Sequence, residues 1–130
     1  MSLDVSPELL AEAERGEVDE AAFVETVRTS LPYAYRMIAD LTRTLEATAG
    51  PFADNTVPPA SEAERGQLLR ALASDSIRGS LERHFGVRLA FQNCHRVAVF
   101  PRGTEHGDPY RTFTSPRAQI LNQSPELRDC

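Results

Sequence analysis

The chain has 130 residues, of which 41% are hydrophobic and 25% are charged, and its formal net charge is −5. These values are typical of globular proteins and exclude a collagen-like, fibrous or wholly disordered chain. No apolar run approaches the roughly 18 residues of a membrane helix, and the acidic N-terminal segment differs from a signal peptide. We therefore expect one domain over residues 1–130, in the cytoplasm and without a membrane partner.

Helical periodicity dominates the first part of the chain. Ser6 followed by Pro7 predicts the start of a helix over 7–15, because serine caps a helix and proline suits its first position. Further apolar stripes predict a helix over about 19–31 and a long one over about 32–49. The next residues, 50–60, contain three prolines and a glycine and predict a loop.

Residues 61–85 begin with the capping box Ser-Glu-Ala-Glu, which predicts a helix start at Ser61. An apolar stripe then continues as far as Phe85. The segment Ser74-Asp75-Ser76 can also cap a new helix, so both one helix and two helices remain open.

Alternating apolar and polar residues in VRLAFQNCHRVAVF predict a β-hairpin over about 87–100. A two-residue loop would mix the two faces, whereas a three-residue loop at 93–95 keeps each face uniform. We therefore predict the three-residue loop, with Cys94 at its exposed tip. This register directs four apolar side chains toward the helices: Leu89, Phe91, Val97 and Val99.

A hairpin alone is only marginally stable in water, which suggests a third strand. Residues 110–114 contain β-prone tyrosine, threonine and phenylalanine and are predicted to supply it. The predicted fold class is α+β, with four to five helices packed on a small antiparallel sheet. The open edges of such a sheet would also allow a homodimer.

Cys94 and His95 are the catalytic candidates, because an imidazole can draw a neighbouring thiol toward the reactive thiolate. Adjacent residues rarely place the imidazole nitrogen on the sulfur, so a turn residue and its neighbour is the simpler interpretation. Cys130 could serve as a thiol handle for a partner. The histidines and cysteines show no zinc-site spacing, so we expect no metal and no cofactor.

All fourteen basic residues are arginine, and residues 65–130 carry a net charge of +4 against −9 for residues 1–64. Four arginines are candidate binding residues among the aromatic side chains of residues 78–117: Arg88, Arg96, Arg102 and Arg111. A sheet carrying arginine and aromatic residues could bind single-stranded nucleic acid. The alternative is that these arginines pair with the acidic half of the same fold, and the chain's overall acidity favours it.

Over its full length the chain resembles a family of small proteins from Streptomyces and related actinomycetes. The resemblance is densest over LDVSPELL, AERGEVDEAAFV, RTSLPYA, RGQLLRALASD, RHFGVRLAFQNCHRVAVFP and LNQSPELRDC. It agrees with the lysine-free composition, which is typical of GC-rich coding. It implies no activity, ligand or catalytic residue.

No phosphate-binding glycine motif, GxSxG elbow or HExxH motif occurs in the sequence. The sequence therefore favours a non-enzymatic interaction or regulatory module that acts through another macromolecule, most simply a protein. Nucleic-acid binding by the arginines of residues 78–117 is one alternative. A thiol-dependent enzyme or redox sensor that uses Cys94 is the other.

Overall fold

The computed structural model describes residues 2–92 and 95–121 and shows an α+β fold in that part of the chain. Its helices are α1 (Pro7–Glu14), α2 (Glu20–Ser30), α3 (Pro32–Thr48), α4 (Glu62–Leu72), α5 (Asp75–Phe85), α6 (Asp108–Phe113) and α7 (Pro116–Leu121). The strands β1 (Ala53–Asp54), β2 (Val87–Gln92) and β3 (Arg96–Pro101) form an antiparallel sheet in the order β1-β3-β2. The predicted fold class is confirmed, with two short helices, α6 and α7, bringing the described helices to seven.

Side-chain caps divide the helical part of the chain. The hydroxyl of Ser6 accepts a hydrogen bond from the amide of Leu9, and Asp19 and Ser61 cap α2 and α4 in the same way. Ser74 accepts the amide of Ile77 at the start of α5. Residues 61–85 therefore form two helices, because the Ser74 cap begins a second one two residues after the first has ended.

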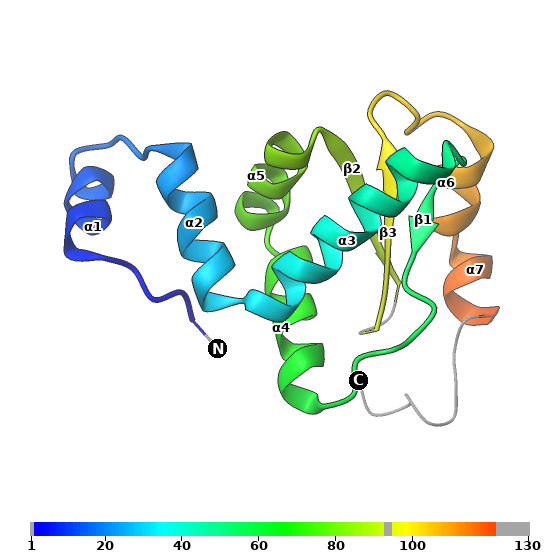
Figure 1. The fold of residues 1–130 in the computed structure, drawn as a ribbon, viewed down its shortest axis with the longest axis horizontal. Coiled ribbons are helices and arrows are strands. Elements are labelled where there is room, and N and C mark those ends of the chain that lie inside the picture. Colours follow the sequence, from blue (N-terminus) through cyan, green and yellow to red (C-terminus); the bar gives the residue numbers. More distant parts are fainter. Residues whose placement is uncertain (1, 93–94, 122–130) are drawn as a thin grey trace.

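The main core lies between the helices and one face of the sheet, which we call the inner face. Helix α3 contacts α2, α4, β1 and β3, while α5 contacts α2, α4 and β2 (Figure 1). Large side chains that are fully buried there include Leu31, Ile38, Leu68, Leu72, Ile77 and Leu81. Helix α1 lies at the end of the molecule far from the sheet and buries only Leu9 among its own residues.

The predicted hairpin register is confirmed. Gln92 pairs with Arg96, Phe91 with Val97 and Leu89 with Val99, as a three-residue loop requires. The four apolar side chains of this register belong to the main core or pack against it. Cys94, predicted at the tip of the loop, lies outside the described residues.

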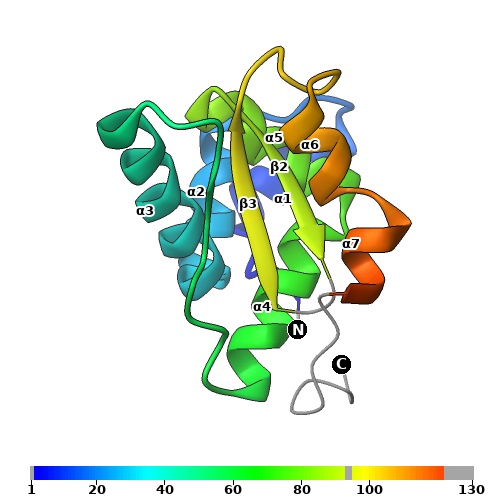
Figure 2. The same ribbon diagram turned by 90° about the vertical axis from the view of Figure 1, so that its right-hand side faces the viewer.

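The opposite, outer face of the sheet is also covered. Ala90, Ala98 and Phe100 are buried there in a second cluster with Phe113 of α6. The ring of Phe52, which precedes β1, stacks on Phe100 with centroids 5.1 Å apart. Figure 2 shows α6 and α7 along the β2 side of this face. In chain order, β1, α4, α5, β2, β3 and α6 thus build a βααββα unit around one sheet.

The third strand was predicted in the wrong place. Residues 110–114 lie mostly in α6, which begins after Gly107 with Asp108 and Pro109, two residues that favour the first turn of a helix. Helical spacing then directs both Tyr110 and Phe113 toward Phe100. Packing between aromatic rings therefore outweighs the β propensity of this segment.

The third strand is instead β1, two residues inside the segment predicted as a loop. Ala53 pairs with Val99 and Asp54 with Ala98 of β3. The next residue, Asn55, extends the pairing with its side chain. Its Oδ1 accepts the amide of Val97 at 2.8 Å, and its Nδ2 donates to the carbonyl of His95 at 2.8 Å.

Among the described residues, no helix combines the length and the apolar character that crossing a membrane requires.

Asn55→Ala should lower the free energy of unfolding by roughly 1–3 kcal/mol, because the partly buried Val97 amide and the His95 carbonyl lose their partner. Thr56→Ala, at the exposed neighbouring residue, should change it by less than about 0.5 kcal/mol. Urea unfolding followed by circular dichroism measures both values. Equal stabilities for the two variants would contradict a structural role for the Asn55 side chain.

Candidate binding site on the outer face of the sheet

The outer face of the sheet carries a pocket of about 380 Å³, a volume within the usual range of small-ligand sites. We call it the sheet-face pocket. It is lined by Phe52, Gln92, Arg96, Asp108, Pro109, Thr112, Phe113 and Ala118. The hairpin register creates it, since it directs Gln92 and Arg96 to the same face as Ala90 and Ala98.

Arg96 is the charged centre of the sheet-face pocket. Its Nε donates to Oδ2 of Asp54 at 2.7 Å, and its Nη2 donates to the same oxygen. Its Nη1 lies 3.4 Å from Oε1 of Gln92, and its Cζ lies 5.1 Å from the centre of the Phe113 ring. The guanidinium therefore joins β3 to β1 and is neutralised by a carboxylate of the fold.

Gln92 and Asp108 complete the polar lining. The side chain of Gln92 is 2% exposed, and its Nε2 donates to the carbonyl of Phe113. This bond ties β2 to the end of α6. Asp108 is exposed at the first position of α6 and makes no ion pair with any residue that the structure describes.

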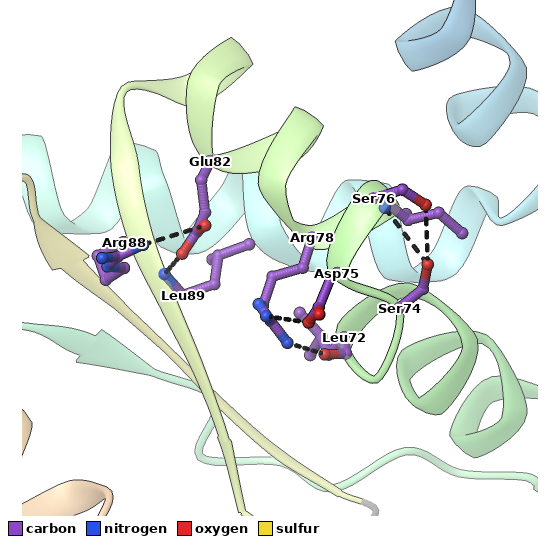
Figure 3. A network of polar contacts seen from close by, with 9 residues as sticks. Leu72, Ser74, Asp75, Ser76, Arg78, Glu82, Arg88 and Leu89 are labelled. Carbon is purple, nitrogen blue, oxygen red and sulfur yellow. Dashed lines mark hydrogen bonds and ion pairs between the residues drawn. The ribbon is translucent and has the colours of Figure 1, made fainter.

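Arg88, a second predicted binding residue, is also engaged by carboxylates. Its Nη1 lies 3.4 Å from Oε1 of Glu82, and its Nε lies 3.1 Å from Oε1 of Glu105. Oε2 of Glu82 also accepts the amide of Leu89 at 2.9 Å (Figure 3). Glu82 thus occupies part of the outer edge of β2 and partly protects that edge against pairing with another strand.

The same figure shows the polar contacts at the start of α5. Arg78 donates to Oδ1 of Asp75 at 2.6 Å and to the carbonyl of Leu72 at 2.8 Å (Figure 3). Its guanidinium thereby closes the turn between α4 and α5. Arg78 and Arg88 therefore both serve contacts within the fold.

The other predicted binding arginines do not line this site. Arg102 follows the end of β3, and Arg111 lies on α6. Neither makes an ion pair with a described residue. Of the four candidates, the structure therefore brings only Arg96 into the sheet-face pocket.

His95 follows the loop and is 9% exposed. Its Nδ1 has no hydrogen-bond partner among the described residues. Burial lowers the pKa of this imidazole from its usual value of 6.5, and the positive charge of Arg96 lowers it further. Cys94, the other predicted catalytic candidate, and the terminal Cys130 lie outside the described residues. Within those residues, no cluster of histidine, cysteine and carboxylate side chains could hold a metal ion.

The fold therefore defines a small α+β protein with a βααββα unit and an aromatic-walled pocket on the outer face of its sheet. A family model described as "NucS shadow ORF" matches residues 1–130, so the chain belongs to that family. No curated protein and no solved structure matches the chain.

Several residues of the pocket had no distinguishing signal in the sequence. Phe52 lies in a proline-rich segment without periodicity. So does Asp54, which does not line the pocket but accepts a hydrogen bond from Arg96, 42 residues away. Gln92 is only one of the polar positions in the alternating hairpin sequence. The one usable signal was the Ala90, Ala98 and Phe100 set, which shows that the outer face also needs a cover.

Lowering the pH from about 7 toward 5.5 should destabilise the protein through His95. Because the pKa of His95 is lower in the folded state, the unfolded chain binds more protons at this residue when the pH is below about 6.5. The free energy of unfolding therefore decreases as the pH is lowered. Urea unfolding across this range should show a weaker dependence for His95→Gln than for the unaltered protein. The exposed His106→Gln is the matched control. An unchanged slope in His95→Gln would show that the imidazole ionises as easily in the fold as in the unfolded chain.

Proposed function

We propose that the chain is a non-enzymatic interaction module that binds a protein with a basic surface. The observation that carries this proposal is the distribution of charge. Residues 1–30 contain eight carboxylates and two arginines, a net charge of −6, whereas residues 31–130 carry +1. We call residues 2–30, which include α1 and α2, the acidic lobe.

The geometry of the acidic lobe supports a docking role. Six of its carboxylates make no ion pair with a described residue: Asp4, Glu8, Glu12, Glu14, Glu17 and Asp19. Three large apolar side chains are exposed among them, Val5 at 44%, Leu10 at 52% and Val18 at 50%. An apolar surface surrounded by negative charge complements a basic protein surface that carries apolar side chains of its own.

A fixed contact holds the acidic lobe to the rest of the molecule. Nε of Arg83 on α5 donates to Oε1 of Glu20 on α2 at 2.7 Å. Phe23, Val24 and Val27 of α2 belong to the main core or pack against it. Helix α2 is thus packed on the body of the molecule, and the six unpaired carboxylates lie before it, on α1 and its flanking segments.

Nucleic-acid binding is the alternative that the name of the family model raises. The model is called KH_NucS_shadow, and KH modules clamp four backbone nucleotides with a Gly-X-X-Gly loop. The βααββα unit is the part of this chain to which such a name could apply. However, no two glycines lie three residues apart in the sequence, and Arg88 and Arg96 already pair with carboxylates. These features favour a protein partner.

We place this module in the cytoplasm of Streptomyces or a related actinomycete. The lysine-free, arginine-rich composition supports such a source. The excess of Asp and Glu over Arg gives the chain a net charge of −5, which attracts a basic partner at long range, and salt weakens this attraction.

Capture from cells of the native host tests the proposal. The variant Glu8→Gln/Glu14→Gln/Glu17→Gln removes three exposed charges of the acidic lobe, and Asp40→Asn/Glu46→Gln/Glu62→Gln removes three exposed charges elsewhere. The unaltered protein and the second variant should recover the same partner, released by salt, whereas the first variant should lose most of it. Circular dichroism should show equal helix content in all three.

Two controls accompany this capture. Peptides of the untagged chain should be detectable in the same cells by mass spectrometry, because the family is described as a shadow open reading frame and the capture requires that the chain is made. Nuclease treatment should leave recovery of the partner unchanged. Recovery that the lobe charges do not affect, recovery that nuclease abolishes, or absence of any specific partner would each overturn the proposal.

A further inference from the structure

The sheet-face pocket offers a second contact, at the opposite end of the molecule from α1 (Figure 1). Its walls are mainly apolar and aromatic. Phe113 is 5% exposed, and its ring lies 6.2 Å from the ring of Phe52. Pro109 and Ala118 add apolar surface from α6 and α7. Such walls suit the hydrocarbon part of a side chain.

The charged residues at the pocket determine which charge its occupant should carry. The positive charge of Arg96 is offset by Asp54, to which it donates through both Nε and Nη2. The carboxylate of Asp108 has no ion-pair partner among the described residues. Among the side chains that line the pocket, Asp108 is therefore the charged group left to pair with an occupant, and two further arginines, Arg111 and Arg117, lie on the same helices without lining the pocket.

An anionic occupant fits these groups poorly. It would meet a guanidinium that already donates to Asp54 through Nε and Nη2, and the carboxylate of Asp108 would repel it. A wholly apolar occupant would bury the Asp108 carboxylate without compensation. A side chain with an apolar stem and a cationic head can pack its stem against the apolar walls and pair its head with the Asp108 carboxylate.

We propose that the sheet-face pocket receives an arginine or lysine side chain of the protein partner. The inference rests on the proposed function for the existence of that partner. The stem of the side chain would lie against Phe52 and Phe113, and its charged head would meet Asp108. The pocket and the acidic lobe would thus both bind basic groups of the same partner.

Titration with short capped peptides tests this inference without the natural partner. The probes are acetyl-Gly-X-Gly-amide peptides with X as arginine, lysine, norleucine or glutamate, followed by chemical-shift changes of the Thr112 and Ala118 amides. The arginine and lysine peptides should shift these amides, and the norleucine and glutamate peptides should bind more weakly. Asp108→Asn should weaken binding of the arginine peptide by roughly two- to fivefold, as expected for a partly exposed ion pair. Asp40→Asn, on the exposed face of α3, should leave it unchanged.

Glutamate or norleucine binding as tightly as arginine would overturn the inference, and so would saturating arginine peptide that moves neither amide. An equal loss in Asp108→Asn and Asp40→Asn would also overturn it, because the effect would then reflect overall charge. Failure of this titration would not contradict the proposal that the acidic lobe binds a basic protein. Capture that depends on the lobe while the peptides fail would show that the proposed function holds without a basic side chain in the pocket.

Discussion

The pairing of β2 with β3 in a single register is the constraint on which the rest of the structure depends. A slip of one residue would exchange Leu89 and Val99, which face the helices, with Ala90 and Ala98, which face α6. The helices would lose their largest contacts with the sheet, and polar Gln92 would enter the main core. The register is therefore held by the burial of both faces of the sheet, and the position of every outer-face residue follows from it.

The sheet-face pocket illustrates this dependence. Arg96 and Gln92 form a register pair, so the hairpin places them side by side on the outer face. Asp54 reaches Arg96 only because β1 pairs antiparallel with the same strand. Phe113 comes over Arg96 because α6 packs on Phe100. The pocket is thus a product of the same contacts that stabilise the fold.

Elements that are determined by interactions within a short segment could be predicted from the sequence. The hairpin register could be derived from the sequence because only one loop length keeps the apolar side chains on one face. The Ser61 cap was equally local, and only the Ser74 boundary needed the structure to decide it. By contrast, β1 has two residues and no periodicity, so its pairing partner determines it rather than its composition.

The candidate site was harder to predict from the sequence, because its contacts also depend on distant partners. Arg96 was a candidate binding residue, but its role depends on Asp54, which lies far away in the chain and carries no motif. Residues 110–114 were assigned by β propensity, whereas their contacts with Phe100 require helical spacing. The interactions that define this site join segments that are distant in the sequence, and short patterns do not encode such pairs.

The charge asymmetry of the sequence is resolved in two parts. Arg83 and Arg96 pair with Glu20 and Asp54 of the acidic half, as the intramolecular interpretation predicted. Arg78 and Arg88 instead pair with carboxylates of their own half. The remaining excess of negative charge is concentrated in the first thirty residues, beyond those pairs. An internally balanced body with an acidic lobe is the arrangement from which we infer a basic protein partner.

Carbodiimide cross-linking tests this central inference most directly. The reagent couples carboxylates to amines, and because the chain contains no lysine, its cross-links to lysine must come from another protein. Mass spectrometry of cross-linked native cells should find bonds from the carboxylates of residues 4–19 to lysines of one partner. Cross-links spread evenly over the carboxylates of the whole chain, or none where peptides of the chain itself are detected, would contradict a docking role for the acidic lobe.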